Sequence, residues 1–311
     1  MPSVTLIQAK TDTGNTPNVS DAFSPAVGDL LVVFVTKEAS ALASPMVSAD
    51  LTSSVAPTGF TLIRNQGHQA SAAHMGVFVA NALCTNTTSR TLTIDSGADA
   101  GAGTIMAIYA VAGMALLGAA AVRQSAGQTD QAAGTPAPTF PAAALTANCC
   151  LGGIYNATNP AGMTPPASWS ELGDVGYTTG QVSGFEGCHR NSGETGTTIT
   201  WGSASASAFA SIIIELWAPV RGRVSWAEFE APNAPTRGRV SFAEFEVPSA
   251  ATATPGRCSW AELEVPTPAT RGRVSWIEFE LPLAPTRGRV SWAEFEIPLA
   301  PTRGRSSWME F

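Results

Sequence analysis

The C-terminal third of the chain repeats one short sequence, and this repeat limits the possible folds more than any other feature. The ten residues RGRVSWAEFE begin at Arg221, and related copies begin at residues 237, 255, 271, 287 and 303, so that successive copies are 16, 18, 16, 16 and 16 residues apart. An apolar residue and a proline follow each complete copy, and glycine is the second residue of every copy. Proline ends a strand ladder because it has no N–H, and glycine permits a bend. The proline density excludes a helical solenoid, so the repeats predict a β architecture.

Read as one continuous strand, the repeated sequence has no clean core side. Alternate residues of a strand share a face, which places Val224, Trp226 and Glu228 opposite Arg223 and Phe229. Each face then combines an aromatic residue with a charge. Such a strand is suited to burial on both sides, against other copies or against a partner.

A single unit of sixteen residues has too little apolar surface to order itself, so it needs neighbours. Three arrangements supply them. The segments of several chains can wind into a fibre shaft, similar to the triple β-spiral of viral fibres. Successive copies can add as strands to identical sites on a repetitive partner, which gives avidity. Alternatively, the copies can form one small sheet within the chain; disorder is the remaining possibility.

The repeated arginine, glutamate and aromatic residues are the candidate contacts of this region. Residues 221–311 contain eleven Arg and no Lys, and arginine forms bidentate ion pairs and, with tryptophan, is common at the centre of interfaces. The aromatic residues can equally be core, but that core would still need more than one copy. The predicted interface residues are Arg221, Arg223, Trp226, Glu228, Phe229, Arg237, Arg239, Phe242, Trp260, Arg271, Arg273, Trp276, Arg287, Arg289, Trp292, Arg303, Arg305 and Trp308.

The preceding residues carry short strand signals without a long amphipathic helix. Nine segments rich in β-branched or aromatic residues are separated by Gly, Pro, Asn and Asp; they are SVTLIQA, GDLLVVFVTKE, GFTLIRN, MGVFVANAL, RTLTID, TIMAIYAV, CCLGGIYNA, TTITWGS and AFASIIIELW. The stretches 125–141 and 159–180 read as long loops. The chain is therefore predicted to be all-β, with a jelly-roll or β-sandwich domain at 1–219 and an extended array of 16-residue β-strand repeats at 220–311.

Charge and cysteine usage exclude several classes of function. Residues 1–220 hold six basic and thirteen acidic residues, and residues 221–311 hold eleven of each. Neither part has the cationic excess that nucleic-acid binding requires. The five cysteines are odd in number and form no CxxC, so we expect buried small apolar residues rather than disulfides or a zinc site. The uncharged stretch 100–122 is long enough to span a bilayer, but its Gly and Ala content and its strand-like neighbours predict a buried strand at Thr104–Val111 and no membrane segment.

No motif for catalysis is present. The sequence lacks GxSxG, a P-loop and HExxH, and its carboxylates are scattered. We therefore expect no enzyme, no catalytic residue, no metal and no cofactor.

The order of the segments GDLLVVFV, PTGFTLI, MGVFVANAL, TLTI, ATNPAGMTPPASWSEL and SASAFASIIIELW resembles the jelly-roll domains of tailed-bacteriophage structural proteins, over about residues 3–217. Such domains occur in capsid decorations, head fibres and tail fibres. The resemblance implies a non-enzymatic protein of the virion surface, with the jelly roll displayed for host attachment and the repeats used for oligomerisation or docking. The implied partners are further copies of the chain, with a trimer as one option, other virion proteins and a host-surface glycan. The alternative is a carbohydrate-binding or glycan-hydrolysing module of a cell surface.

Overall fold

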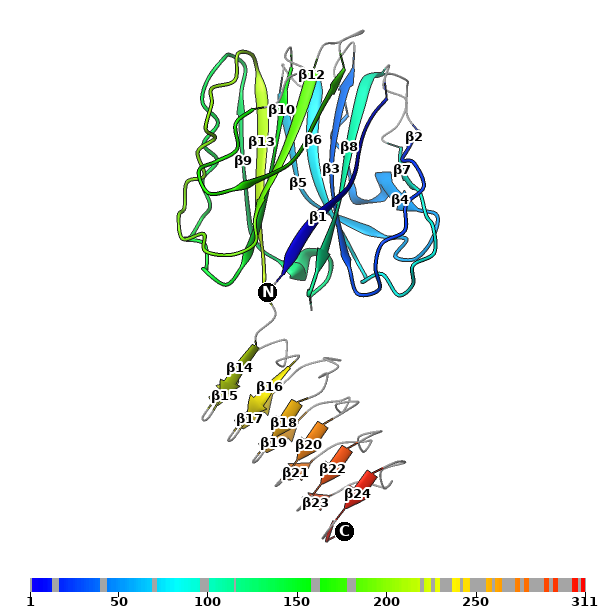
Figure 1. Cartoon of the computed structure of the whole chain (residues 1–311), viewed down its shortest axis with the longest axis vertical. Coiled ribbons are helices and arrows are strands. Elements are labelled where there is room, and N and C mark those ends of the chain that lie inside the picture. The colour runs from blue at the N-terminus through cyan, green and yellow to red at the C-terminus, as the bar shows by residue number, and fades with distance from the viewer. Residues whose placement is uncertain are drawn as a thin grey trace. The chain divides into compact units, whose positions relative to one another are not determined.

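The computed structural model divides the chain into two compact units, Met1–Ala218 and Pro219–Phe311 (Figure 1). In the first unit the structure describes residues 2–12, 17–39, 44–68, 72–95, 101–114, 116–157, 163–177 and 183–218, and in the second unit it describes twelve short strands.

The first unit is a sandwich of two five-stranded antiparallel sheets. The first sheet comes from residues 3–112 and has the order β1 (Ser3–Asp12), β8 (Gly101–Ala112), β3 (Leu30–Ala39), β6 (Ala73–Ala80), β5 (Phe60–His68). The second sheet comes from residues 122–216 and has the order β11 (Ser170–Tyr177), β12 (Ser183–Arg190), β10 (Cys149–Asn156), β13 (Phe209–Leu216), β9 (Val122–Asp130). The prediction of an all-β sandwich is thus confirmed.

Smaller elements cover the outer side of the first sheet and connect the two sheets. A three-stranded sheet has the order β2 (Asn18–Val19), β7 (Leu92–Ile94), β4 (Leu51–Ser53). Two short 3-10 helices, η1 (Ser48–Asp50) and η3 (Gly118–Ala121), complete the regular structure. The buried strand predicted at Thr104–Val111 is confirmed as the centre of β8. No helix among the described residues is long and apolar enough to cross a membrane.

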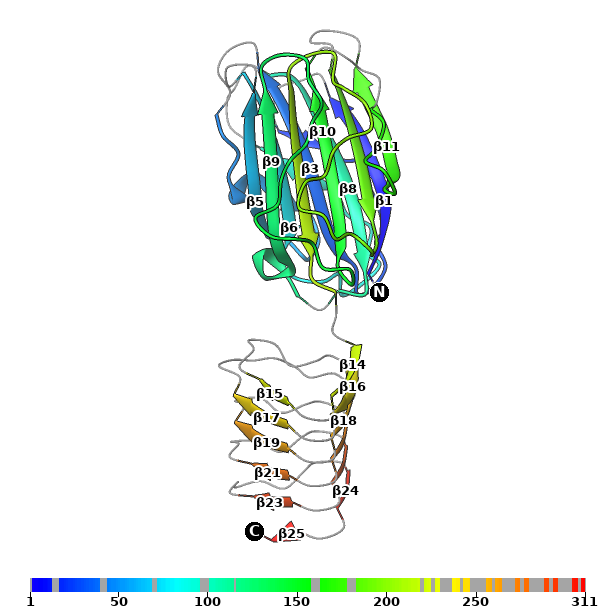
Figure 2. The ribbon, with the colours of Figure 1, turned by 90° about the vertical axis from the view of Figure 1, so that its left-hand side faces the viewer.

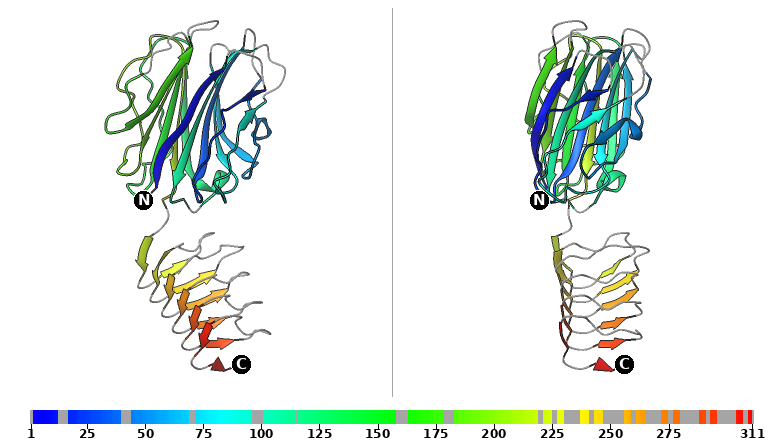
Figure 3. Two further views of the ribbon diagram at one scale, coloured as in Figure 1. Left: turned by 45° about the vertical axis from the view of Figure 1, so that its right-hand side comes forward. Right: turned by 90° about the vertical axis from the view of Figure 1, so that its right-hand side faces the viewer.

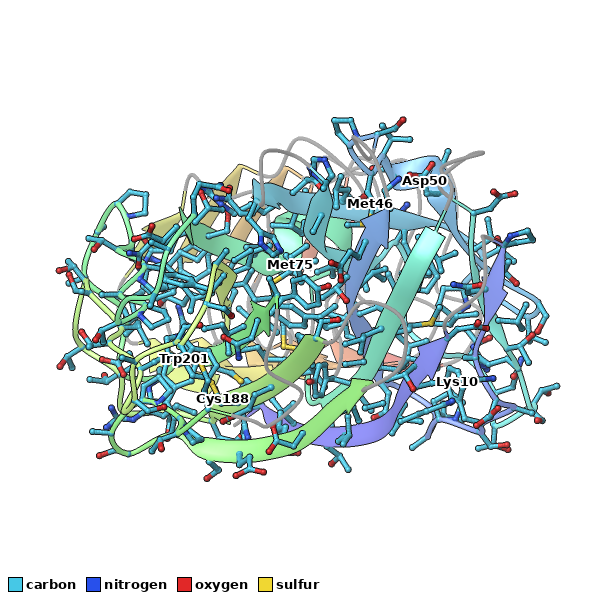
Figure 4. The ribbon with its side chains drawn as sticks, turned by 90° about the horizontal axis from the view of Figure 1, so that it is seen from above. Lys10, Met46, Asp50, Met75, Cys188 and Trp201 are labelled. Carbon is cyan, nitrogen blue, oxygen red and sulfur yellow. The ribbon has the colours of Figure 1, made fainter. Side chains whose placement is uncertain are left out.

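The sandwich has apolar residues both between its sheets and outside them. The main core fills the space between the sheets, where the ring of Phe34 meets Tyr109 and Phe185 with centroids 5.8 and 6.0 Å apart. A second core, which contains Trp169, Cys188 and Trp201, belongs to the outer side of the second sheet. Figure 4 looks along the strands and shows Met46 on one outer side, Met75 in the middle, and Cys188 with Trp201 on the opposite side.

Two glycines of the second sheet leave room for large buried side chains of the first. A Cβ atom placed on Gly187 would lie 1.9 Å from Oη of Tyr109, and one placed on Gly153 would lie 2.7 Å from Cε of Met75 and 2.9 Å from Cδ1 of Phe34. Any side chain at either position would therefore collide with a buried side chain of the first sheet.

The two sheets have the same topology. Numbered along the chain within each half, the five strands of both sheets lie in the order first, fifth, second, fourth, third. Each half also has a register shift at the same place, between Leu62 and Arg64 in one and between Glu171 and Gly173 in the other. The sheet edges meet reciprocally, since β1 lies beside β11 and β5 beside β9 (Figure 2). The sandwich is therefore a duplicated five-stranded unit, with its halves related by an approximate twofold axis.

Three strands were missed by the sequence prediction. β9 extends over the first residues of the predicted loop 125–141, β11 lies in the second half of the predicted loop 159–180, and β12 was not expected. β9 and β11 are the edge strands of their sheet, and edge strands are commonly polar or glycine-containing, so they lack the apolar run that signals a strand. Conversely, TTITWGS is not a regular strand: it forms one bridge, Thr139–Thr198, and its Trp201 N–H donates to the carbonyl of Pro136.

In the second unit, each repeated sequence forms two short strands in two different sheets. The first strands make one six-stranded parallel sheet, β14 (Arg221–Val224), β16 (Arg237–Val240), β18 (Gly256–Cys258), β20 (Gly272–Val274), β22 (Gly288–Val290), β24 (Gly304–Ser306). The second strands make the other, β15 (Ala227–Phe229), β17 (Ala243–Glu246), β19 (Ala261–Glu264), β21 (Ile277–Phe279), β23 (Ala293–Phe295), β25 (Met309–Glu310). Successive copies are neighbours in both sheets (Figure 3).

This arrangement corrects the expectation of one continuous strand. Alternation has to be counted separately in each strand, which puts Gly222 and Val224 opposite Arg223 in β14, and Ala227 opposite Glu228 in β15. Each short strand thus has one apolar and one charged face. Of the three arrangements expected for the repeats, the structure shows pairing within the chain, in two parallel sheets rather than one small sheet.

Candidate interface on the repeat unit

Parallel, in-register pairing aligns identical residues of successive copies. The first sheet carries a row that we call the arginine ladder, consisting of Arg223, Arg239, Arg257, Arg273, Arg289 and Arg305. The second sheet carries the glutamate ladder, consisting of Glu228, Glu244, Glu262, Glu278, Glu294 and Glu310. Every copy contributes one residue to each ladder, so the two rows have the same length and the same period.

Apolar rows occupy the opposite face of the same strands. The first sheet aligns Val224, Val240, Cys258, Val274, Val290 and Ser306, and the second aligns Phe229, Phe245, Leu263, Phe279 and Phe295. Alignment of apolar residues on one face is the pattern by which stacked repeats stabilise their neighbours. A single unit has no neighbour with which to form such rows.

In the charged rows, unlike the apolar rows, neighbouring side chains repel each other electrostatically. Adjacent strands lie about 4.8 Å apart, and two like charges at that distance repel by about 1 kcal/mol in water. Like charges directly opposite each other on neighbouring strands are destabilising, and arginine stays charged at every relevant pH. An opposite charge of the same spacing would relieve the repulsion within each ladder.

The structure describes half of the predicted interface residues. Arg223, Arg239, Arg273, Arg289, Arg305 and Glu228 belong to the two ladders, Phe229 belongs to an apolar row, and Arg221 and Arg237 begin their strands. Trp226, Phe242, Trp260, Arg271, Trp276, Arg287, Trp292, Arg303 and Trp308 lie outside the described residues. The prediction missed Arg257 and the five later glutamates of the ladder, although the 16-residue spacing contained the signal for them.

The sandwich contains a buried ionic cluster with a structural arrangement. The carboxylate of Glu215 in β13 is fully buried and accepts hydrogen bonds from Arg123 Nη1 (2.6 Å), Gln124 Nε2 (2.5 Å), Asn148 Nδ2 (2.6 Å) and the Leu145 N–H (2.8 Å). Asn148 Oδ1 in turn accepts from the N–H of Ala218, the last residue of this unit. These four donors satisfy both oxygens of the carboxylate. The cluster therefore links β13 to β9 and to the segment between β9 and β10.

A second polar cluster lies between the sheets. Tyr155 Oη donates to Glu38 Oε2 over 2.5 Å, and the ring of His68 meets the Tyr155 ring edge-on with centroids 4.9 Å apart. Neither ring nitrogen of His68 has a hydrogen-bond partner among the described residues. Burial, with a smaller contribution from the charge of His74, lowers the pKa of His68 to about 4, so the ring is neutral at neutral pH.

The other titratable groups of the sandwich are also set by burial. Burial, aided by the charge of Asp174, raises the pKa of the Glu186 carboxyl to about 8. The thiols of Cys84, Cys149, Cys150 and Cys188 are free and buried, as the sequence predicted. Burial raises the pKa of each of them, that of Cys149 to about 12, so they remain protonated and unreactive. Within the described ranges, no group of three His, Cys, Asp or Glu side chains is placed to hold a metal ion.

Comparison of the chain with models of protein families, with curated proteins and with solved structures finds no match. The two ladders of the repeat unit are the most regular chemical feature of the described residues.

Proposed function

We propose that this chain is a non-enzymatic structural protein of a bacteriophage particle, a fibre or a decoration, in which the repeat unit mediates assembly and the sandwich is displayed at the particle surface. One observation carries the proposal: six copies present the same two charged rows at a constant period. A surface with a regular repeat suits a partner that is itself regular, and many weak contacts on it add up to avidity.

The sandwich supports the displayed role. The order of its apolar segments along the sequence resembles that of the jelly-roll domains of phage structural proteins, and we propose the same class of displayed domain for it on the basis of two antiparallel sheets packed face to face. Its topology differs from a jelly roll in one respect, because each sheet comes from one contiguous half of the domain. Loops on such a rigid scaffold are the usual place for contacts with a receptor, here a host-surface glycan.

Removal of residues 219–311 tests the assembly role. We expect the full chain to form oligomers in solution and residues 1–218 to remain folded and monomeric, as measured by sedimentation velocity and far-UV circular dichroism. If the truncated chain associates as the full chain does, the repeat unit is not the assembly element. If residues 1–218 bind or cleave glycans while the repeats prove dispensable, the alternative of a carbohydrate-active module takes its place.

A further inference from the structure

We propose that the arginine ladder of one chain binds the glutamate ladder of a second copy of the same chain. The inference depends on the proposed assembly role of the repeats and names the surfaces that would perform it. It treats the two rows as complementary halves of a single interface.

The geometry of the rows fits such a contact. Both ladders contain one residue per copy, and both are generated by parallel in-register pairing of neighbouring strands, so their rungs have the same spacing. When one guanidinium of a ladder meets a carboxylate of the partner's ladder, the remaining five are aligned as well. Arginine and carboxylate also match in shape, because two parallel N–H groups can meet two oxygens.

Charge balance favours a second copy over a polyanion. Residues 221–311 contain eleven Arg and eleven Glu, so the unit is neutral as a whole. A nucleic acid that binds a unit without net positive charge gains little from counterion release. Another copy of this chain offers a negative row of the right length to the arginine ladder and a positive row to the glutamate ladder.

The position of the ladders also determines the symmetry of the contact. They lie in different sheets, β14–β24 and β15–β25, so the surface that one copy uses differs from the surface that its neighbour uses. A contact of this kind is heterologous, and it closes into a ring or continues as a filament. A closed ring would give the small oligomer expected of a fibre. The mass of the oligomer in solution gives the number of chains in the ring.

Charge reversal in three central rungs tests the pairing in the full chain. One variant carries R257E, R273E and R289E, and the other carries E262R, E278R and E294R. Each variant alone opposes like charges in three of six rungs, so we expect at least a tenfold weaker self-association by sedimentation velocity at 50 mM NaCl. In an equimolar mixture every contact between unlike variants has six complementary pairs, so we expect the two variants to associate with each other. An even-numbered ring or a filament then forms at the strength of the unchanged chain, whereas an odd-numbered ring stays open at one contact.

Two controls keep the result decisive. Replacement of the same arginines by lysine retains the charge, and we expect association to fall less than with the reversal. A single chain that carries both triple changes keeps complementary ladders, and we expect it to fold and associate normally.

The outcomes separate this inference from the assembly role itself. If the chain with both changes folds and associates while the mixture does not, the ladders pair within one chain, and the inference is overturned. If the triple variants associate as strongly as the unchanged chain, assembly uses another surface. The inference then fails, but the assembly role stands on the truncation result.

If the triple variants do not fold, the salt dependence of the unchanged chain decides. We expect its self-association to weaken at least tenfold from 50 to 500 mM NaCl, because exposed charges are screened at that ionic strength. Unchanged self-association would overturn the pairing.

Discussion

Single residues set the distance between the two sheets of the sandwich. Gly187 lies against the buried Tyr109 ring, whose Oη and Cζ would be 1.9 and 3.0 Å from an added Cβ. We expect Gly187→Ala to lower the free energy of unfolding by about 2–3 kcal/mol, because the ring has no room to move aside. Urea denaturation of the full chain, followed by tyrosine and tryptophan fluorescence, measures the change.

The matched control is Tyr109→Phe, which removes an Oη without a hydrogen-bond partner among the described residues. Its own effect is expected to be a stabilisation of up to about 1 kcal/mol, because the change removes the desolvation cost of a buried unpaired hydroxyl and loses only a little packing. In the double variant, the cost of Gly187→Ala should drop by about 1 kcal/mol. Strict additivity of the two changes would show that the ring and the glycine do not limit each other.

The Glu215 cluster predicts a large effect from a small chemical change. Glu215→Gln removes the charge that pairs with Arg123 at 2.6 Å and replaces an acceptor by a donor facing other donors. Breaking a buried pair costs about 3–5 kcal/mol, and we expect a loss of that size by thermal and urea unfolding. Asp21→Asn is the comparison, since the Lys10–Asp21 pair has an aspartate side chain 74% exposed and should contribute under about 1 kcal/mol. Equal effects of the two changes would contradict the structural role of the cluster.

His68 predicts acid sensitivity. Its pKa is about 4 in the folded chain and about 6.5 when unfolded, so the unfolded chain takes up the proton first as the pH falls. The contribution of this residue to stability is complete above pH 6.5 and is lost progressively toward pH 4, by roughly 3 kcal/mol. Glu186, whose pKa is raised to about 8, acts in the opposite direction, since its contribution is lost as the pH rises from about 4.5 to 8.

The two groups are separated by comparing variants across pH. We expect the stability of His68→Phe, relative to the unchanged chain, to increase as the pH is lowered from 6.5 to 4, and that of Glu186→Gln to increase from pH 4.5 to 8. Urea midpoints at half-unit steps of pH give both curves. Parallel curves for His68→Phe and the unchanged chain would mean that His68 titrates normally in the folded state.

At the scale of elements, the sequence predicted strands where apolar residues run together and failed where they do not. β3, β8 and β13 are long apolar runs at the interior of their sheets, and the prediction placed all three. The edge strands β9 and β11 read VRQSAGQTD and SELGDVGY, which is the polar and glycine-containing composition of loops. Whether a strand lies at the edge of a sheet depends on the whole fold. The local sequence pattern therefore cannot predict it.

The repeated sequence shows the same limit in another form. Its alternation runs without interruption through Trp226, and this suggested one strand with mixed faces. The apolar residues Val224, Ala227 and Phe229 nevertheless have odd and even spacings, so a single strand cannot put them on one face, and the division into β14 and β15 resolves the conflict. The duplication of the sandwich was missed because its halves share a pattern rather than identities; PTGFT at Pro57 and PASWS at Pro166 begin equivalent strands.

Deletions of different length test the register of the repeats. Removal of residues 271–286, a whole copy, joins Thr270 to the next copy and leaves every row intact, so we expect the β signal and the melting temperature of the repeat unit to change little. Removal of residues 271–275 takes out β20 alone and brings β21 to the chain distance from β19 that β20 has in the unchanged chain, so a strand of the second sheet meets the first sheet, and we expect loss of the β signal from the copies beyond it. Far-UV circular dichroism and limited proteolysis distinguish the two. Equal tolerance of both deletions would mean that copies do not pair in register.

At the scale of the whole sandwich, the two halves have the same topology but complementary side chains. Phe34 pairs with Val77 in the first sheet, and at the equivalent place Gly153 pairs with Gly187 in the second. Across the sandwich, the Phe34 ring lies where a Gly153 side chain would be. A sandwich made of two first halves would bring two Phe34 rings together at this place, and one made of two second halves would leave a cavity between glycines. The divergence of the halves thus specifies which sheet pairs with which.

This complementarity predicts the behaviour of the separated halves. A cut after Gly113, in the connection between β8 and η3, gives the fragments 1–113 and 114–218, each with one complete five-stranded sheet. We expect the fragments to form a 1:1 complex with the circular dichroism of residues 1–218, because all contacts between the sheets cross between the fragments. Native mass spectrometry of each fragment alone should show no stable dimer, since two Phe34 rings would meet in a dimer of the first fragment and a cavity would remain in a dimer of the second. Gly153→Phe in the second fragment should abolish the mixed complex, whereas the exposed Asp21→Asn in the first should not. Stable homodimers of either fragment would show that the Phe34–Gly153 and Tyr109–Gly187 contacts do not determine how the halves pair.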